Sequence, residues 1–131
     1  MIMVKKKSLN KRKLLKIIRE EFPRLRFFKA IINNKGWDHN TLILDDKLVF
    51  RFPKDEFYMK NIKIEMQLLN AFSKNSPLKV PKYDFIGKST VFGGYRLIEG
   101  RELTKTAFEK LSKLQKKSCA KKLGEFLTAL H

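Results

Sequence analysis

Apolar positions recur at helical spacing in the first part of the chain. The pattern predicts a helix over about 9–21, which Ser8 or Asn10 can cap and which Pro23 ends. The apolar stripe of this helix consists of Leu14, Ile17 and Ile18. The segment 26–33, "RFFKAIIN", is rich in β-formers and predicts a strand, which Gly36 separates from the next extended segment.

Alternating apolar positions follow, in "HNTLILDD" and "KLVFRFP", and predict two strands around a tight turn. In the second strand the side chains of Leu48, Phe50 and Phe52 point to one face of the sheet. Val49 and Arg51 point to the other face, so an arginine lies in the middle of an otherwise apolar strand.

Helical spacing returns over about 57–73, where the apolar stripe is Ile62, Met66 and Leu69 and where Glu65 falls on the same face. A second hairpin is expected at about 82–87 and 90–98, and two helices at about 103–110 and 112–130. The order α-β-β-β-α-β-β-α-α predicts an α+β fold, a mostly antiparallel five-stranded sheet with a helix inserted after its third strand.

The predicted last helix has an apolar stripe that little chain is left to cover. The stripe consists of Leu123, Phe126, Leu127 and Leu130, and the sequence stops at His131 without a capping glycine. We therefore expect a covering partner, either another chain or a C-terminal half.

The charge of the chain is strongly positive, +17, with 30 basic and 13 acidic residues. This balance fits RNA or a phosphorylated ligand, but also a solvated basic surface, because the lysines are spread along the whole sequence. One cysteine, Cys119, forms no internal disulfide, and no apolar run reaches the roughly 20 residues of a membrane span. We expect a cytoplasmic protein, and a basic RNA-binding or protein-interaction module is the alternative function.

Few residues are candidates for chemistry. Arg51 and Glu65 would each cost several kcal/mol to bury alone, so a mutual ion pair is expected, either structural or holding the guanidinium for a phosphate. The turn at Gly36 can present backbone N–H groups to an anion. His39 and His131 lie far apart, and neither metal-ligand spacing nor a nucleophile–histidine–acid motif is present.

Taken together, five segments resemble the aminoglycoside phosphotransferase family, which shares the protein-kinase fold. They are "NKGWDHNTLILDDKLVFRFPK", "IKIEMQLLNAF", "VPKYDFIG", "YRLIEGREL" and "KKLGEFLTALH". The string "VFRFPK" looks most like the branch that phosphorylates the 2″-hydroxyl of aminoglycosides. The resemblance implies an N-terminal helical segment over 1–25, a nucleotide-binding N-lobe over 26–99, and a linker with the first helices of a truncated C-lobe over 100–131.

The resemblance also implies roles for individual residues. Arg51 would contact the α- and β-phosphates of ATP or GTP with Glu65 as its helix partner, and Val49 would pack on the purine. The loop over the phosphates would consist of Gly36, Trp37, Asp38, His39 and Asn40. The hinge that reads the purine edge would consist of Arg96, Leu97 and Ile98, with Leu97 or Tyr95 shaping the pocket.

The chain departs from the family in its catalytic half. It contains neither the H-x-D-x-x-x-x-N loop that orients the substrate hydroxyl nor the following metal-binding aspartate. We expect no catalytic or metal-binding residue in this chain, no turnover by it alone, and Mg²⁺ only together with the C-terminal half. The acceptor would be a hydroxyl of an aminoglycoside or of a metabolic alcohol, bound through the C-lobe. A separate C-terminal chain remains an alternative, and neither a membrane nor nucleic acid is an expected partner.

Overall fold

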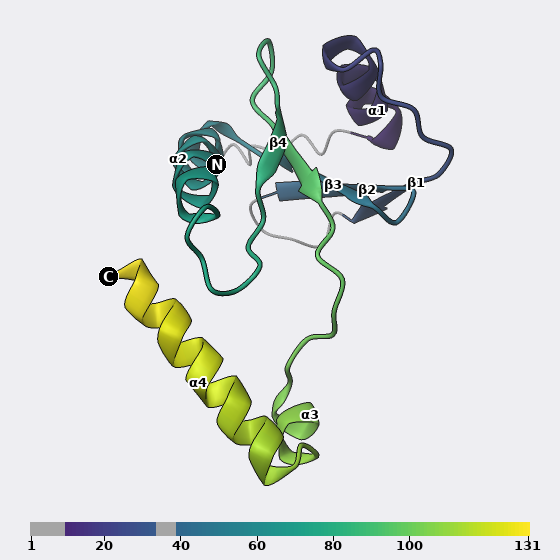
Figure 1. Ribbon diagram of the computed structural model, residues 1–131. Helices are drawn as coiled ribbons and strands as arrows, with labels where there is room; N and C mark the ends of the chain where they lie inside the picture. The colour runs from purple at the N-terminus through teal and green to yellow at the C-terminus, as the bar shows by residue number, and fades with distance from the viewer. Residues whose placement is uncertain (1–9, 34–38) are drawn as a thin grey trace, which may run out of the picture.

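A computed structural model describes residues 10–33 and 39–131 of the chain. Its strands form one antiparallel sheet in the order β1-β2-β3-β5-β4 (Figure 1). The elements are α1 (Lys11–Glu21), β1 (Ala30–Asn33), β2 (His39–Leu44), β3 (Leu48–Pro53), α2 (Glu56–Phe72), β4 (Tyr83–Ile86), β5 (Gly93–Arg96), α3 (Lys105–Glu109) and α4 (Lys113–Leu130). The predicted fold class, with a helix inserted after the third strand, is confirmed.

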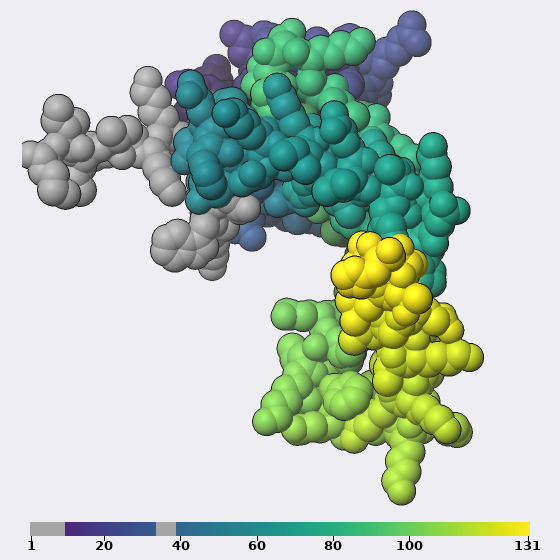
Figure 2. All heavy atoms as spheres, turned by 90° about the vertical axis from the view of Figure 1, so that its left-hand side faces the viewer, coloured from purple at the N-terminus to yellow at the C-terminus, as the bar shows by residue number. Residues whose placement is uncertain are grey.

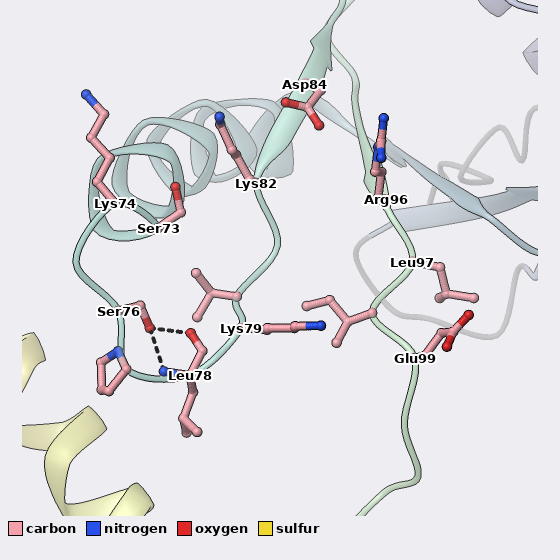
Figure 3. A pocket seen from close by; sticks show the side chains of 13 residues that line it. Ser73, Lys74, Ser76, Leu78, Lys79, Lys82, Asp84, Arg96, Leu97 and Glu99 are labelled. Carbon is pink, nitrogen blue, oxygen red and sulfur yellow. Dashed lines mark hydrogen bonds between the residues drawn. The ribbon is translucent and has the colours of Figure 1, made fainter.

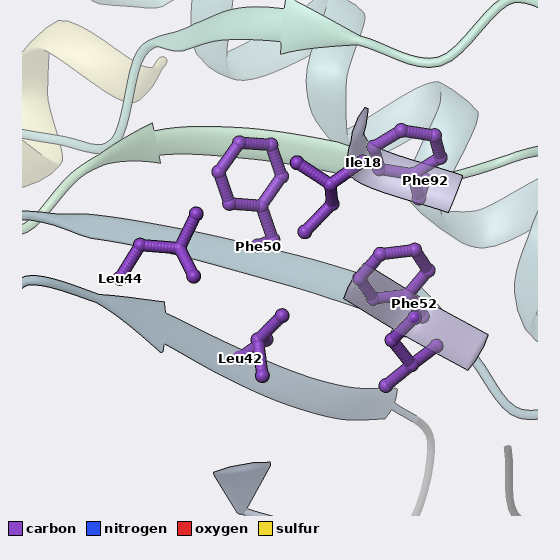
Figure 4. Packing of buried hydrophobic residues seen from close by; sticks show 7 residues of the cluster. Ile18, Leu42, Leu44, Phe50, Phe52 and Phe92 are labelled. Carbon is purple, nitrogen blue, oxygen red and sulfur yellow. The ribbon is translucent and has the colours of Figure 1, made fainter. Parts of the chain in front are cut away.

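The apolar core lies on the sheet face that α1 covers, which we call the outer face. Asn10 caps α1 by accepting a hydrogen bond from the Lys13 N–H at 3.0 Å, and this helix buries Leu14 and Ile18 completely. The core cluster consists of Leu14, Ile18, Leu42, Leu44, Phe50, Phe52 and Phe92 (Figure 4). Phe52 and Phe92 stack with their ring centroids 4.8 Å apart. This aromatic contact joins β3 to the residue that directly precedes β5.

Helix α2 packs on the opposite face, which we call the inner face. Asp55 caps the helix by accepting from the Tyr58 N–H at 3.2 Å. Ile62 and Met66, two members of the predicted stripe, form a second buried cluster with Tyr83. The alternation of β3 is confirmed, because Phe50 belongs to the outer cluster while Arg51 reaches α2.

The first strand is shorter than the predicted 26–33. The carboxylate of Asp45 accepts hydrogen bonds from the N–H groups of Phe28 and Lys29, at 2.9 and 2.7 Å. Ladder pairing starts only at Ala30, opposite Leu44, the last residue of β2. The backbone just before β1 is therefore bound by a turn side chain and not by a neighbouring strand.

The last strand is also shorter than predicted, Gly93–Arg96 in place of about 90–98. The loop before it is held by Glu21 at the end of α1. This carboxylate accepts from the backbone N–H groups of Lys88, Ser89 and Thr90, at 3.3, 2.6 and 3.3 Å. Of these three residues only Thr90 lies within the predicted strand, so Glu21 binds the N–H of its first residue and the loop before it.

The two C-terminal helices lie below the sheet in Figure 1. Figure 2 shows the end of α4 against the region of α2, where the rings of Phe126 and Phe72 meet edge to face at 5.5 Å. The other members of the predicted stripe, Leu123, Leu127 and Leu130, are about half exposed. Within residues 10–33 and 39–131, no helix has both the length and the apolar character needed to cross a bilayer.

Substitution of the central core ring tests the packing of the outer face. Phe50 is fully buried, so Phe50→Ala is expected to lower the free energy of unfolding by about 3–5 kcal/mol in urea denaturation. Phe28 is fully exposed, and Phe28→Ala is the matched control, with a change within about 0.5 kcal/mol. Equal effects of the two substitutions would contradict the described core.

The contact of Glu21 with the β4–β5 loop predicts a pH-dependent stability. The Ser89 N–H above all, with those of Lys88 and Thr90, lowers the pKa of the Glu21 carboxyl below its ordinary value of 4.5. A lowered folded-state pKa stabilises the fold above the unfolded value and loses that contribution as the pH falls through the folded value. At pH 7 we expect the wild type to have a higher melting temperature than the Glu21→Gln variant. This difference in melting temperature should shrink below pH 4.5. A difference in melting temperature that is constant with pH would refute the charged contact.

Candidate functional site

Arg51 is the centre of the candidate site. It lies on β3 between Thr41 of β2 and Gly93 of β5, and its side chain is 21% exposed. Nη1 donates to the Glu65 carboxylate at 2.7 Å and to the Tyr83 hydroxyl at 3.0 Å, and Nη2 lies 3.2 Å from Nδ1 of His39. We call Arg51, Glu65, Tyr83 and His39 the arginine cluster; strands β2, β3 and β4 and helix α2 each contribute one residue to it.

The predicted pair of Arg51 and Glu65 is confirmed in the structure. A guanidinium cannot be deprotonated at neutral pH, so a partly buried one requires acceptors. Burial opposes the charge of Arg51, but Tyr83 and Glu65 outweigh it, and the pKa of the guanidinium is raised. The ion pair therefore keeps a permanent positive charge at a fixed point of the inner face.

His39 takes part in this arrangement, although the sequence alone identified it only as a polar residue of the phosphate loop. An arginine N–H can only donate, so Nδ1 of His39 is the acceptor in this contact. His39 is buried, 5% exposed, and follows the same face of β2 as Thr41. The alternation of "HNT" was the signal that could have placed it beside Arg51.

Tyr83 is the cluster member that the sequence did not identify. Register shifts between Tyr83 and Phe85, where β4 is irregular. Tyr83 consequently belongs to the inner cluster while Phe85 packs on the outer one, whereas strict alternation would put both on one face. A bulge leaves no reliable sequence signal, which explains why the hydroxyl contact to Arg51 was not foreseen.

The predicted phosphate loop is described only in part. Gly36, Trp37 and Asp38 lie outside the described residues. His39 faces Arg51, but the neighbouring Asn40 lies opposite Phe52 with its side chain buried, 1% exposed, on the other face of β2. The side chain of Asn40 is therefore turned away from the arginine cluster, and only its backbone could serve a ligand on the inner face.

The predicted purine contacts are altered in two respects. Val49 is buried, only 5% exposed, between its neighbours Ile43 of β2 and Tyr95 of β5. Its side chain therefore offers little free surface to a purine. The Leu97 N–H donates to the Lys47 carbonyl at 2.8 Å and is thus engaged. Ile98 has no hydrogen-bond partner for its N–H among residues 10–33 and 39–131.

The hinge residues border two open clefts. One, of about 730 Å³, lies between the α2–β4 loop and residues 96–99 (Figure 3). Its charged lining consists of Lys74, Lys79, Lys82, Asp84, Arg96 and Glu99. The other, of about 570 Å³, lies between the β2–β3 turn and the residues Arg96, Leu97 and Glu99. Arg51 lines neither of these two clefts.

In the part of the chain that the structure describes, no group of three or more histidine, cysteine, aspartate or glutamate side chains could hold a metal ion.

Solved structures with a similar fold include several aminoglycoside phosphotransferases. The GDP and kanamycin complex of APH(2″)-IIia matches 92% of this chain at a TM-score of 0.81 and 27% identity. The GDP complex of wild-type aminoglycoside 2′-phosphotransferase-IIIa matches 93% at 0.82 and 26%. The streptomycin–ATP–APH(2″)-IIa ternary complex matches 95% at 0.78 and 19%.

The match covers only a part of those proteins. The chain spans 41%, 42% and 40% of their respective lengths, which corresponds to their N-terminal lobe. No protein-family model matches the sequence, and no curated protein matches it significantly. The structural likeness therefore supports the kinase-like fold that the sequence motifs indicated.

Removal of the carboxylate tests the ion pair. Glu65→Ala leaves Arg51 without its anionic partner and is expected to lower the free energy of unfolding by about 1–2 kcal/mol, less than for a fully buried pair because Glu65 is 36% exposed. Glu20→Ala is the control, since its exposed pair with Lys16 spans 3.9 Å and should contribute within about 0.5 kcal/mol.

A double-mutant cycle with Arg51→Met separates the pair from other effects of the substitution. The cost of Glu65→Ala should fall in the Arg51→Met background. An unchanged cost would show that the two residues are not coupled.

Proposed function

We propose that this chain, which has the fold of the N-terminal lobe of the aminoglycoside 2″-phosphotransferases, is the nucleotide-binding part of a phosphotransferase. The observation that carries the proposal is the contact of Arg51 with Glu65 at 2.7 Å on the inner face of the sheet. It is supported by the similarity to proteins solved with GDP.

Arg51 is the residue that we assign to the nucleotide phosphates. A guanidinium has five N–H donors, of which Arg51 directs three toward described residues, namely Glu65, Tyr83 and His39. Two donors have no acceptor among the described residues, and phosphate oxygens are the acceptors that arginine binds with strong charge-assisted hydrogen bonds. His39 and the backbone of Asn40 would lie at the phosphate end, together with Gly36, Trp37 and Asp38.

The purine is assigned to the hinge formed by residues 96–98. Because the Leu97 N–H is engaged by Lys47, the N–H of Ile98 is the donor that we assign to the purine edge. A backbone group of this kind binds either ATP or GTP. The side chains of Leu97 and Ile98 are each more than one-third exposed and are available to cover the base.

The complete reaction would move the γ-phosphoryl group of ATP or GTP to a hydroxyl of a small molecule. The acceptor that we favour is an aminoglycoside, and a metabolic alcohol is the alternative acceptor. The acceptor, the catalytic base and Mg²⁺ would be bound by a C-terminal lobe, within the same protein or on a separate chain. The 131-residue chain would bind nucleotide in the cytoplasm without turning it over.

Nucleotide titration tests the proposal. GDP and ADP, added separately to the ¹⁵N-labelled chain, are expected to shift the amide signals of β2, β3 and residues 96–98. Arg51→Ala should weaken the binding about 10-fold to 100-fold, as expected for the loss of a hydrogen bond to a charged group. With ATP or GTP, Mg²⁺ and kanamycin, no phosphorylated product should form.

Arg12→Ala is the matched control, because Arg12 is an exposed arginine on α1 and its loss changes the net charge equally. It should leave the affinity unchanged. Binding that is lost equally in both variants would reduce the effect to net charge, and unaltered binding by Arg51→Ala would exclude the assigned role.

A further inference from the structure

We propose that Tyr83 is a positioning residue that fixes the orientation of the Arg51 guanidinium toward phosphate. This inference rests on the proposed function and deepens it. It assigns a role to the buried hydroxyl of Tyr83 on β4. Neither the Arg51–Glu65 ion pair nor the core packing requires this hydroxyl.

Tyr83 is held in place from three sides. Its backbone N–H donates to Oδ1 of Asn70 at 2.7 Å, and Nδ2 of Asn70 donates to the Tyr83 carbonyl at 3.0 Å. The amide of Asn70 thus fastens the start of β4 to α2. The ring packs with Ile62 and Met66 and is 2% exposed, so the hydroxyl has a defined position.

The sheet leaves room for this ring opposite Arg51. Gly93 is the register partner of Arg51, and a Cβ at that position would lie 2.5 Å from both the Tyr83 ring and the sulfur of Met66. Any side chain at Gly93 would therefore displace the tyrosine. The bulge in β4 and the glycine in β5 together aim the hydroxyl at Nη1 of Arg51, 3.0 Å away.

The chemistry of the hydroxyl suits a positioning task. Burial raises the pKa of Tyr83 to about 12, although the charge of Arg51 acts in the opposite direction. The hydroxyl is therefore neutral at pH 7 and accepts a hydrogen bond without cancelling positive charge. Within residues 10–33 and 39–131 Glu65 is the anionic partner of Arg51, while the Tyr83 hydroxyl and Nδ1 of His39 contact Nη1 and Nη2.

Tyr83→Phe separates positioning from packing, because it removes one oxygen and retains the buried ring. The first readout is the side-chain ¹⁵N spectrum of Arg51 without nucleotide. We expect the Nη signals to shift and to exchange faster in Tyr83→Phe. They should be unchanged in Ser76→Ala, which deletes a hydroxyl that is hydrogen-bonded to Leu78 in the α2–β4 loop. Unchanged Arg51 signals in Tyr83→Phe would overturn the proposal.

The second readout compares GDP with guanosine, and ADP with adenosine, on the same variants. Loss of positioning should weaken binding of the diphosphates about threefold to tenfold, the range of one lost hydrogen bond, and leave the nucleosides unaffected. Equal weakening of nucleoside and diphosphate would assign Tyr83 a structural role only and contradict the proposal. If the wild-type chain bound no diphosphate, the proposed function would fail, and the first readout alone would decide whether Tyr83 orients Arg51.

Discussion

The partly buried guanidinium of Arg51 requires hydrogen-bond acceptors, and the arrangement of the inner face depends on this requirement. Arg51 lies on a strand whose neighbouring residues, Phe50 and Phe52, are buried in the outer core. Because side chains alternate along a strand, a shift of one residue would exchange the arginine with a phenylalanine and expose the core. The aromatic packing therefore fixes the register of β3, and this register places Arg51 against Glu65 of α2. The register of β3 consequently positions both the apolar core and the candidate site.

Carboxylates that bind backbone N–H groups hold the rest of the sheet around this strand. Asp45 binds the segment before β1, and Glu21 binds the loop between β4 and β5. Both join parts of the chain that are distant in sequence, without adding apolar surface. The clamp of Asn70 on β4 has the same character on the inner face. Polar contacts to backbone thus position the elements, while the two apolar clusters provide the burial.

The sequence predicted those features that depend on periodicity. The strand of "KLVFRFP", the stripe of α2 and the pair of Arg51 with Glu65 all follow from spacing, and the structure contains them. The limits of β1 and β5 were wrong, because Asp45 binds the N–H groups of Phe28 and Lys29 and Glu21 binds that of Thr90. Tyr83 was not identified because a bulge turns it to the inner face, and Asn40 was assigned to a loop although the ladder of β2 buries its side chain. Such features depend on tertiary contacts, which a single sequence does not encode locally.

A crystal structure of the chain with bound GDP or ADP tests the central claim most directly. The account predicts that a phosphate oxygen lies within hydrogen-bonding distance of Arg51 on the inner face, with Glu65, Tyr83 and His39 still in contact with the guanidinium. Phosphates bound instead by Lys74, Lys79 and Lys82, or on the outer face beside α1, with Arg51 free of phosphate, would contradict it.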